Sequence, residues 1–364
     1  MRKLYIEPTS RCNLSCLICF RNSWIDETGG DLAPAVFDKI IETLPASVET
    51  IFFGGMGEPL VHPEIISLVR QAAATGRRVE MLTNATLLNQ TRARLLLAAG
   101  LARLWVSLDS LELTDKNKGN HTLSLIQTNL DAFNRERKSL NSGAALGLNF
   151  VVMKSNASQL ALMPAFAHRY DISEINVSNV LAADKDSVAE ILYDKALNEG
   201  FGSSRSQVEV EINVPMMDWR QPEVMRGLQG LLASPEARLR LSGQPVIRPV
   251  GRCRFIEEDC AFVRHDGQVS PCMALLHSGI TYLGARERKV YHHSFGHLPS
   301  QGLEAIWQSD EYSRFRERVK KFDFSPCLRC SGCELSEENK TDCFRSPGPA
   351  CGPCLWAEGL ISCP

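Results

Sequence analysis

The distribution of cysteines constrains this chain more than any other feature of its sequence. Three of the 13 cysteines lie close together near the N-terminus and ten lie beyond residue 252, so residues 20–252 contain none. Disulfide frameworks are typical of small secreted proteins, whereas this chain has 364 residues and an odd number of cysteines. The first residues also lack the apolar stretch of a signal peptide. We therefore expect a cytoplasmic protein whose clustered thiols bind metal.

The overall composition argues against two classes of partner. Forty basic and 42 acidic residues give a formal net charge of -2, which offers no electrostatic basis for binding nucleic acid or an anionic membrane surface. No apolar run reaches the roughly 20 residues that a membrane span requires. The hydrophobic content of 44% is enough for a sizeable core. We expect a globular protein with no nucleic-acid partner and no membrane partner.

The cysteine-free segment alternates short β-rich runs with segments of helical pattern. The predicted strands are Leu4–Glu7, Thr50–Phe53, Val79–Thr83, Leu104–Leu108, Leu146–Met153 and Glu174–Asn179. The predicted helices are Ala35–Leu44, Pro63–Ala74, Leu87–Ala99, Thr122–Lys138 and Ser158–Arg169. This alternation predicts right-handed βαβ units and a parallel sheet, hence an α/β fold. In such folds the functional loops follow the carboxyl ends of the strands.

The pattern is weaker between residues 182 and 252, which we treat as a bridging segment. Val208–Val214 is predicted to be a strand, and Glu223–Leu241 has a helical pattern interrupted by Ser234-Pro235. Further on, His265-Asp-Gly267 is typical of a hairpin turn. One amphipathic helix is predicted from the spacing of seven large apolar residues, which we assign to packing: Leu303, Ile306, Trp307, Tyr312, Phe315, Val319 and Phe322.

The first cysteine group has the spacing Cys12-x3-Cys16-x2-Cys19 and directly follows the first predicted strand. Three thiolates this close can ligate three irons of one [4Fe–4S] cluster, which leaves the fourth iron open to an external ligand. Tetrahedral zinc usually needs a fourth protein ligand, and the nearest histidine, His62, is distant in sequence. A zinc knuckle or three unrelated buried thiols remain the alternatives.

This spacing resembles the signature of the radical S-adenosylmethionine (SAM) superfamily, in which the amino and carboxylate groups of SAM chelate the open iron. The resemblance implies a partial (β/α)6 barrel of parallel strands and catalytic roles for Cys12, Cys16 and Cys19. Ile18 stands where the family usually has an aromatic residue near the adenine, and Phe20 is a candidate to replace it.

Glycine-rich and polar segments after the second and third strands extend the resemblance. Gly54-Gly55-Met56-Gly57-Glu58-Pro59 is similar to the Gly-Gly-Glu turn of the family, which implies that Gly54, Gly55, Gly57 and Glu58 bind the methionyl ammonium of SAM. Taken alone, this segment also fits a glycine-rich strand exit. After the third strand, Thr83-Asn84 occupies the position of the family's Thr-Asn pair, with Ala85 in place of the usual glycine.

Two further positions complete the implied SAM site. Ser107-Leu-Asp109, after the fourth strand, stands where the family binds the ribose hydroxyls. Lys118-Gly119 stands where an Arg-Gly pair is common, so Lys118 is a candidate to bind the SAM carboxylate. A single lysine in a polar loop is more often simply solvated.

The ten later cysteines have two competing interpretations. They run Cys253-x6-Cys260-x11-Cys272, then Cys327-x2-Cys330-x2-Cys333, Cys343, Cys351-x2-Cys354 and Cys363. Cys327-x2-Cys330-x20-Cys351-x2-Cys354 nearly fits a four-thiolate zinc ribbon, although zinc leaves six cysteines unexplained. Cys327-x2-Cys330-x2-Cys333 also opens like a ferredoxin-type run, and ten thiolates are sufficient for two [4Fe–4S] clusters.

This region resembles the SPASM extension of radical SAM enzymes, which carries up to two auxiliary clusters. The resemblance implies Cys253, Cys260 and Cys272 as ligands of the first auxiliary cluster, and Cys327, Cys330 and Cys333 as ligands of the second. The fourth ligand of each is left among Cys343, Cys351, Cys354 and Cys363. The expected organisation is a radical SAM core over 1–181, the bridge over 182–252 and a small Cys-rich SPASM-like domain over 253–364.

The resemblance also implies a function. Members of the superfamily cleave SAM reductively to a 5′-deoxyadenosyl radical, with electrons from a donor such as ferredoxin or flavodoxin. Three segments make the layout similar to the maturases of tungsten-containing aldehyde ferredoxin oxidoreductases: Ile6-Glu-Pro-Thr9, Phe20-Arg-Asn-Ser-Trp24 and Cys354-Leu-Trp-Ala-Glu-Gly359. The implied substrate is a tungsten oxidoreductase polypeptide or its pterin cofactor.

Two alternatives to this function stay open. One is a radical SAM maturase that modifies another peptide, although Met273, where the sulfatase-maturating branch has Asp, argues against formylglycine formation. The other is a non-catalytic protein whose thiols hold iron–sulfur clusters or zinc.

Overall fold

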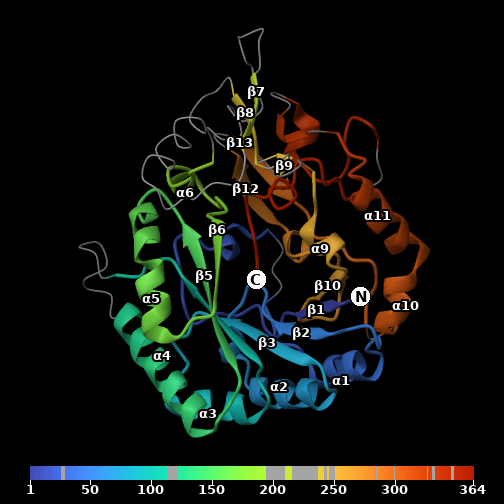
Figure 1. Cartoon of the computed structure of the whole chain (residues 1–364). Helices are drawn as coiled ribbons and strands as arrows, with labels where there is room; N and C mark the ends of the chain where they lie inside the picture. Colours follow the sequence, from blue (N-terminus) through green and yellow to red (C-terminus); the bar gives the residue numbers. More distant parts are fainter. Residues whose placement is uncertain are drawn as a thin grey trace.

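An eight-stranded, mostly parallel sheet forms the centre of the molecule (Figure 1). The computed structural model describes residues 1–25, 29–112, 122–193, 210–214, 237–241, 244–245, 251–283, 286–298, 300–325, 327–329, 333–345 and 348–364. Six strands follow one another in chain order: β1 (Lys3–Ile6), β2 (Thr50–Phe53), β3 (Arg78–Thr83), β4 (Arg103–Leu108), β5 (Ala145–Val152) and β6 (Glu174–Asn179). All their pairings are parallel, which confirms the predicted α/β fold and partial barrel.

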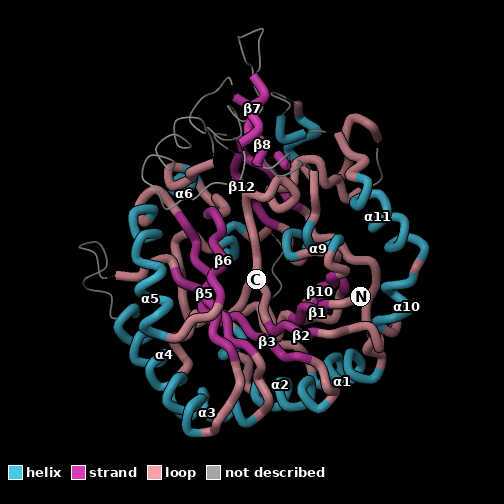
Figure 2. The backbone as a smooth tube through the Cα atoms, in the orientation of Figure 1, coloured by secondary structure: helices cyan, strands magenta, loops and turns pink. Residues whose placement is uncertain are grey.

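Helices cover the outer face of this curved sheet, as Figure 2 shows. They are α1 (Pro34–Glu42), α2 (Ile65–Ala74), α3 (Gln90–Ala98), α4 (Thr122–Ser139) and α5 (Met163–Tyr170). Successive strand residues point to opposite faces. Leu4 and Ile6 accordingly pack in the large core that the helices share, while Tyr5 stacks on Phe262 in a second core on the inner face.

The Cys-rich region contributes two strands to the same sheet. β10 (Cys260–Val263) pairs in parallel with β1, and β11 (Val269–Ser270) pairs antiparallel with β10. The predicted hairpin turn joins them, and Gly267 adopts the positive φ of 90° that such a turn requires. The Cys-rich region, which we expect to begin at residue 253, therefore shares one sheet with the first six strands.

The later part of the chain also forms smaller elements. These are α6 (Lys185–Val188), the strands β7 (Val210–Val214), β8 (Ala237–Leu241) and β9 (Gln244–Pro245), α9 (Arg254–Glu257), and the antiparallel pair β12 (Gly279–Leu283) and β13 (Arg286–Val290). β7 confirms a predicted strand. Residues 223–236 of the predicted helix over Glu223–Leu241 lie outside the described residues, and its end is wrong, because Ala237–Leu241 pairs with β7 as a strand. The alternation of arginine with leucine in this segment suits a strand.

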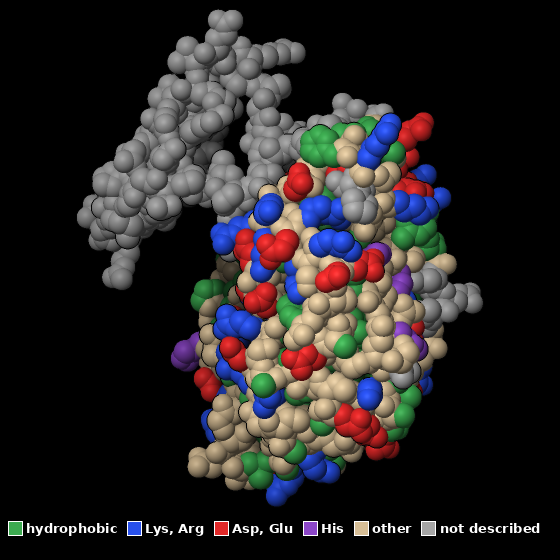
Figure 3. All heavy atoms as spheres, turned by 90° about the vertical axis from the view of Figure 1, so that its right-hand side faces the viewer, with side chains coloured by type: hydrophobic (Ala, Val, Ile, Leu, Met, Phe, Trp, Pro, Cys, Tyr) green, Lys and Arg blue, Asp and Glu red, His purple; other side chains and the backbone are tan. Residues whose placement is uncertain are grey.

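Two helices replace the single amphipathic helix that the sequence predicts. α10 (Leu303–Gln308) and α11 (Asp310–Lys321) are separated at Ser309, whose side chain accepts a hydrogen bond from the Tyr312 amide and so caps α11. Both helices bury their apolar residues against the main core. On this side of the molecule acidic and basic side chains are interspersed (Figure 3), so the face carries no large field of one sign.

The C-terminal segment runs through the space that the curved sheet encloses (Figure 1), and it contacts both β6 and β1. Ser362 donates from its amide to Ser178 Oγ on β6, at 3.1 Å, and the Tyr5 hydroxyl on β1 donates to the Pro364 carbonyl, at 2.7 Å. In Figure 1 the C-terminus accordingly lies within the ring of strands. None of the described helices combines the length and apolar character needed to cross a membrane.

Candidate active site and cysteine clusters

The three N-terminal cysteines lie on the loop that follows β1. The Cys19 amide donates to the Cys16 carbonyl at 3.1 Å and turns the loop back on itself. Cys16 is exposed, yet the protein around its sulfur raises the pKa of its thiol to about 11. The charges of Asp109, Cys19 and Cys12 add to this rise, so all three groups lie near the Cys16 sulfur. The fold therefore brings the three thiols together beside the end of β4.

Amide donors surround the Cys12 sulfur. The Leu14 amide lies 3.4 Å from Cys12 Sγ, and the side-chain nitrogen of Asn84 lies 3.8 Å from it. N–H groups aimed at sulfur are a normal feature of protein-bound iron–sulfur clusters and adjust their potential. The donor set of this loop, three thiols with N–H partners, fits a [4Fe–4S] cluster bound through three cysteines.

Gly57 fixes the path of the cysteine loop. A Cβ atom at this position would lie 2.0 Å from the Thr9 carbonyl oxygen and 2.8 Å from that of Arg11. The neighbouring Glu58 amide donates to the Arg11 carbonyl at 2.8 Å. Only glycine permits this close approach, so Gly57 positions the backbone immediately before Cys12.

Glu58 is buried, and protein groups occupy its carboxylate. Oε1 accepts hydrogen bonds from the Thr83 hydroxyl at 2.6 Å and the Leu60 amide at 3.0 Å, while Oε2 accepts from the Asn84 amide at 2.7 Å. Burial raises the pKa of Glu58, and these hydrogen bonds oppose the rise. The side chain thus ties the loop after β2 to the loop after β3, which places Asn84 beside Cys12.

Gly55 and Ala85 both have positive φ angles. Gly55 has φ of 145°, and a Cβ atom there would lie 2.8 Å from Glu7 Cγ. Ala85, where the family commonly has glycine, is fully buried with φ of 58°, a left-handed conformation that glycine adopts without strain. The backbone at this position therefore favours glycine over alanine.

The predicted ribose-binding residues lie at the end of β4. Ser107 is half-buried in the strand and Asp109 is exposed just beyond it. Asn156 donates from its side chain to the Asp109 carbonyl at 2.8 Å, which fixes the backbone there. Lys118 lies outside the described residues.

Three other residues near the loop have structural roles. His62 is buried, with Nε2 3.2 Å from the Leu32 carbonyl and Nδ1 accepting from the Glu64 amide, so both ring nitrogens have protein partners. Ile18 packs against an apolar cluster that includes Leu355. Phe20 is buried against Gly279, where a Cβ atom would lie 2.7 Å from its ring.

Four of the later cysteines form a second group. Burial and the neighbouring Cys354 thiolate raise the pKa of Cys253 to about 12. Burial is the main cause that raises the pKa of Cys272 and of Cys351, and the charges of Cys354 and Cys253 add to it. Cys272, Cys351 and Cys354 line one cavity, together with Trp356 and Arg288. These four thiols fit the ligand number of a [4Fe–4S] cluster.

Arg288 on β13 is a buried cation beside these thiols. It is only 4% exposed, and its Nε donates to the Ser336 carbonyl at 2.9 Å. Burial lowers the pKa of Arg288 to about 10, while the nearby charges of Cys354 and Cys327 oppose this fall. Sequence reasoning missed Arg288, since an arginine in a strand carries no pattern that points to a cysteine cavity.

The remaining cysteines lie in different surroundings. Cys260 is fully buried on β10. Burial raises its pKa to about 12, although the positive charge of Lys3 opposes the rise. Cys363 accepts from the Trp356 indole at 3.5 Å, and Cys327 Sγ lies 2.9 Å from Ser325 Oγ. Cys343 is exposed and Cys333 is half-buried. Cys330 lies outside the described residues, so the second predicted set cannot be assembled from the described part of the chain.

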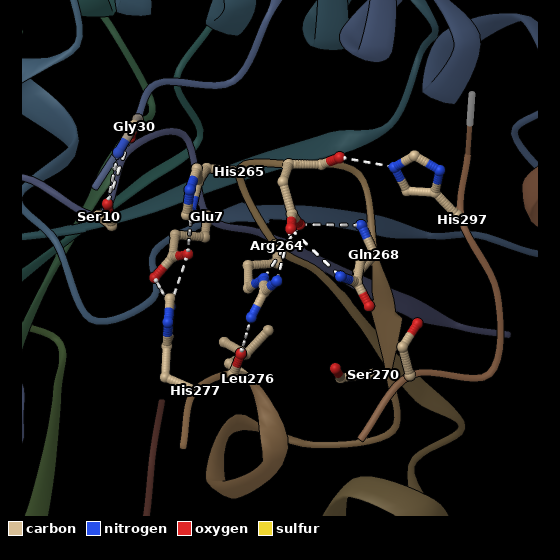
Figure 4. A network of polar contacts seen from close by, with 12 residues as sticks. Glu7, Ser10, Gly30, Arg264, His265, Gln268, Ser270, Leu276, His277 and His297 are labelled. Atoms are coloured by element: carbon tan, nitrogen blue, oxygen red, sulfur yellow. Dashed lines mark hydrogen bonds and ion pairs between the residues drawn. The ribbon is translucent and has the colours of Figure 1, made fainter. Parts of the chain in front are cut away.

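A buried carboxylate–histidine group was also missed by sequence reasoning. Glu7, at the end of β1, accepts hydrogen bonds from His265 at 3.1 Å and from His277 at 2.9 and 3.0 Å (Figure 4). Burial would raise the pKa of Glu7, but the two histidines outweigh it and hold the value at about 2. No local pattern could join residues more than 250 positions apart.

Comparison with known proteins agrees with this geometry. Residues 6–149 match the radical SAM superfamily, and residues 253–334 match an iron–sulfur cluster-binding domain, SPASM. The structure of anSMEcpe with bound AdoMet and the Cp18Cys peptide superposes with a TM-score of 0.55 at 16% identity, covering 98% of this chain and 95% of that chain. Streptococcus suis SuiB bound to S-adenosylmethionine also gives 0.55, at 18% identity, over 90% of this chain and 70% of that one. The fold and cysteine loop define a SAM-dependent iron–sulfur enzyme.

Curated relatives extend over the whole chain. The tungsten-containing aldehyde ferredoxin oxidoreductase cofactor-modifying protein of Pyrococcus furiosus is 29% identical over 373 residues, covering 100% of this chain and 97% of that protein. An AdoMet-dependent heme synthase of Oleidesulfovibrio alaskensis is 30% identical over 90% of this chain and 79% of its own length. The chain belongs to the radical SAM superfamily, in its SPASM-containing branch of maturases and modifying enzymes, and its cofactors are [4Fe–4S] clusters and SAM.

Proposed function

We propose that this enzyme matures a tungsten-containing oxidoreductase of the aldehyde ferredoxin type, by modifying either the polypeptide or its pterin cofactor. The observation that carries the proposal is the similarity to the Pyrococcus furiosus cofactor-modifying protein, which spans both chains almost completely. A match of this extent includes the loops after the strands and the C-terminal segment, and not the barrel alone. The activity supplied by the bound cluster and SAM is one-electron cleavage of SAM.

The residues divide into holding and positioning roles. Cys12, Cys16 and Cys19 hold the SAM-binding cluster. Gly54 and Gly55 let the backbone after β2 pack closely on Phe52 and Glu7. In this arrangement the same backbone binds the methionyl ammonium of SAM. Gly57 and Glu58 position the cysteine loop and Asn84 through the contacts described above. Ser107, Asp109 and Lys118 bind the ribose and carboxylate of SAM.

The C-terminal region holds at least one auxiliary cluster on Cys253, Cys272, Cys351 and Cys354. Besides burial, the charge of Cys354 raises the pKa of Cys253, Cys272 and Cys351, whereas Cys260 is affected by Cys253 and does not line the cavity, which supports this set over one that includes Cys260. Cys327, Cys330 and Cys333 bind a second auxiliary cluster, with a fourth ligand from Cys343 or Cys363. The functional division is a SAM core over 1–181, a bridge over 182–252 and an auxiliary-cluster region over 253–364. A ferredoxin or flavodoxin supplies electrons in the cytoplasm.

Peptide modification is the second candidate function. The PqqA peptide cyclase of Bradyrhizobium diazoefficiens is 27% identical over 178 residues, which cover 48% of this chain and 45% of that enzyme. The shorter match favours a shared SAM core and says less about the substrate. It is therefore the weaker proposal.

A reconstitution assay tests the choice between the two functions. The anaerobically reconstituted enzyme is incubated with SAM, dithionite and, separately, a tungsten oxidoreductase lacking its mature cofactor, the isolated pterin, or the oxidoreductase polypeptide alone. We expect 5′-deoxyadenosine to form in proportion to a modified pterin or polypeptide, detected by mass spectrometry, and neither product to form with Cys16→Ala. Nucleoside formation without modification of any of the three substrates would contradict the tungsten proposal while leaving SAM cleavage intact.

A further inference from the structure

The Glu7, His265 and His277 group combines three metal-ligand side chains in one buried position. One ligand atom from each residue lies within 4.8 Å of the others. The side chains of Glu7 and His277 are fully buried, and that of His265 is 7% exposed. Figure 4 shows Glu7 between the two imidazoles, with the ring nitrogens of both directed at its carboxylate. The three residues come from the end of β1, the β10–β11 turn and the segment before β12.

The distances suit ligands around a small cation. His265 Nδ1 lies 3.1 Å from Glu7 Oε2, and His277 Nε2 lies 2.9 Å from the same oxygen. Ligand atoms about 2.0 Å from a tetrahedral zinc ion are separated from one another by about 3.3 Å. The side chains would therefore need to shift by only a few tenths of an ångström at these two pairs to accept an ion.

Charge balance favours a cation at this position. An ionised carboxylate out of contact with water needs a compensating positive charge or several strong donors. The Glu7 carboxylate accepts hydrogen bonds from the two imidazoles and from the Met56 amide, the latter at 3.1 Å. The neighbouring Arg264 donates to Asp266 and to the Leu276 carbonyl. A divalent ion, or a protonated histidine, would supply a positive charge in direct contact with the carboxylate.

The surroundings hold the ligands in place. The Trp24 ring stacks on His277, with ring centroids 4.0 Å apart. A Cβ atom at Gly30 would lie 3.0 Å from the His265 ring, so the loop after β1 closes over that imidazole. Metal-binding histidines are characteristically fixed in this way by the groups behind them. Trp24 and Gly30 both belong to the segment that carries the SAM-binding cysteines.

We propose that Glu7, His265 and His277 bind one divalent transition-metal ion, with Zn²⁺ the ion best matched to two imidazoles and a carboxylate. The ion would connect the end of β1, just before the SAM-cluster loop, to the C-terminal region. None of the cysteines in the described part of the chain belongs to this site, and the site does not depend on the identity of the substrate.

Zinc content and coordination test the proposal. The reconstituted holoenzyme is exposed to a small excess of Zn²⁺, desalted, and analysed for zinc, iron and sulfide. We expect about one retained zinc per chain, and an X-ray absorption spectrum with nitrogen or oxygen neighbours at about 2.0 Å rather than sulfur at about 2.3 Å. Zinc bound adventitiously to cysteines would show the sulfur distance and overturn the proposal. So would the absence of retained zinc, which would leave a histidinium as the counter-charge.

Matched variants separate this site from general effects on folding. Glu7→Gln and His277→Gln should each lower zinc retention at least tenfold while iron and sulfide per chain stay unchanged. His62→Gln serves as the control, since His62 is equally buried but is hydrogen-bonded to backbone groups. It should retain zinc. Where a variant loses iron as well, His265→Gln provides the second test, and retention of zinc in every soluble ligand variant would overturn the assignment.

Discussion

The two cysteine groups are assembled in opposite ways. Cys12, Cys16 and Cys19 come from eight consecutive residues of one loop and include an exposed thiol. Cys253, Cys272, Cys351 and Cys354 come from segments up to 101 residues apart and are half-buried, and the last three of them line one cavity. A loop can present thiols to an external ligand, while a cavity encloses its contents. From this comparison we expect the first cluster to exchange a ligand and the second to be bound by protein thiols alone.

The largest expected effect comes from removing a thiol of the loop. Cys16→Ala should abolish 5′-deoxyadenosine formation and lower the iron content by about four atoms per chain, because two thiols rarely retain a cubic cluster. Iron bound to the C-terminal cysteines should remain. Chromatography of the nucleoside product and iron analysis check both outcomes, and undiminished SAM cleavage would show that the loop does not hold the catalytic cluster.

Removing a thiol from the cavity should affect the second cysteine group and leave the first intact. Cys354→Ala should lose about four iron atoms and lower the midpoint of thermal unfolding, while the loop cluster still cleaves SAM in the absence of substrate. Cys260→Ala is the control, because Cys260 is a cysteine of the same region that is buried on β10 beside Lys3 and does not line the cavity. It should retain its iron. Loss of iron in Cys260→Ala with retention in Cys354→Ala would reverse the assignment of the ligands.

Replacement of Arg288 should change the reduction potential of the second cysteine group only. Arg288→Gln removes a buried positive charge beside Cys354, so the oxidised, less negative form of the auxiliary cluster becomes relatively more stable. We expect the reduction potential of that cluster to fall by roughly 60 mV, equivalent to a tenfold change in a one-electron equilibrium. Potentiometric titration followed by electron paramagnetic resonance measures the change, and the potential of the loop cluster should not move.

Glu58 tests how firmly the loop is anchored. Glu58→Gln replaces one acceptor oxygen by an amide donor that faces the Thr83 hydroxyl or a backbone amide, so a buried donor loses its partner. The expected loss of stability is about 1–3 kcal/mol. Thermal unfolding of the reconstituted protein measures it, and Glu64→Gln, at an exposed position, should have no comparable effect.

Ala85→Gly is expected to have the smallest effect. Relief of the left-handed conformation gains about 1–2 kcal/mol. Loss of a buried methyl group and the greater freedom of glycine when unfolded each oppose this by about 1 kcal/mol. The net change should stay below about 1 kcal/mol, and a large destabilisation would show that the Ala85 methyl group packs more tightly than its burial alone indicates.

Local sequence patterns were sufficient for much of the fold. Each predicted strand from Leu4–Glu7 to Glu174–Asn179 corresponds to a strand of the sheet, because apolar β-rich runs and glycine stops act over a few residues. The errors also have local causes. The leucine–arginine alternation in β8 was assigned to a helix, and the capping role of Ser309 between α10 and α11 was overlooked.

By itself the sequence determined the barrel, the SAM-cluster loop and the family, because the ligands of that loop lie next to one another in the chain and their spacing can be read directly. Only the tertiary structure joined β10 to β1, selected Cys351 and Cys354 as neighbours of Cys253, and placed His265 and His277 on Glu7. These contacts depend on how the C-terminal region packs onto the sheet. Packing between distant segments has no period or spacing in the sequence, so no local pattern records it.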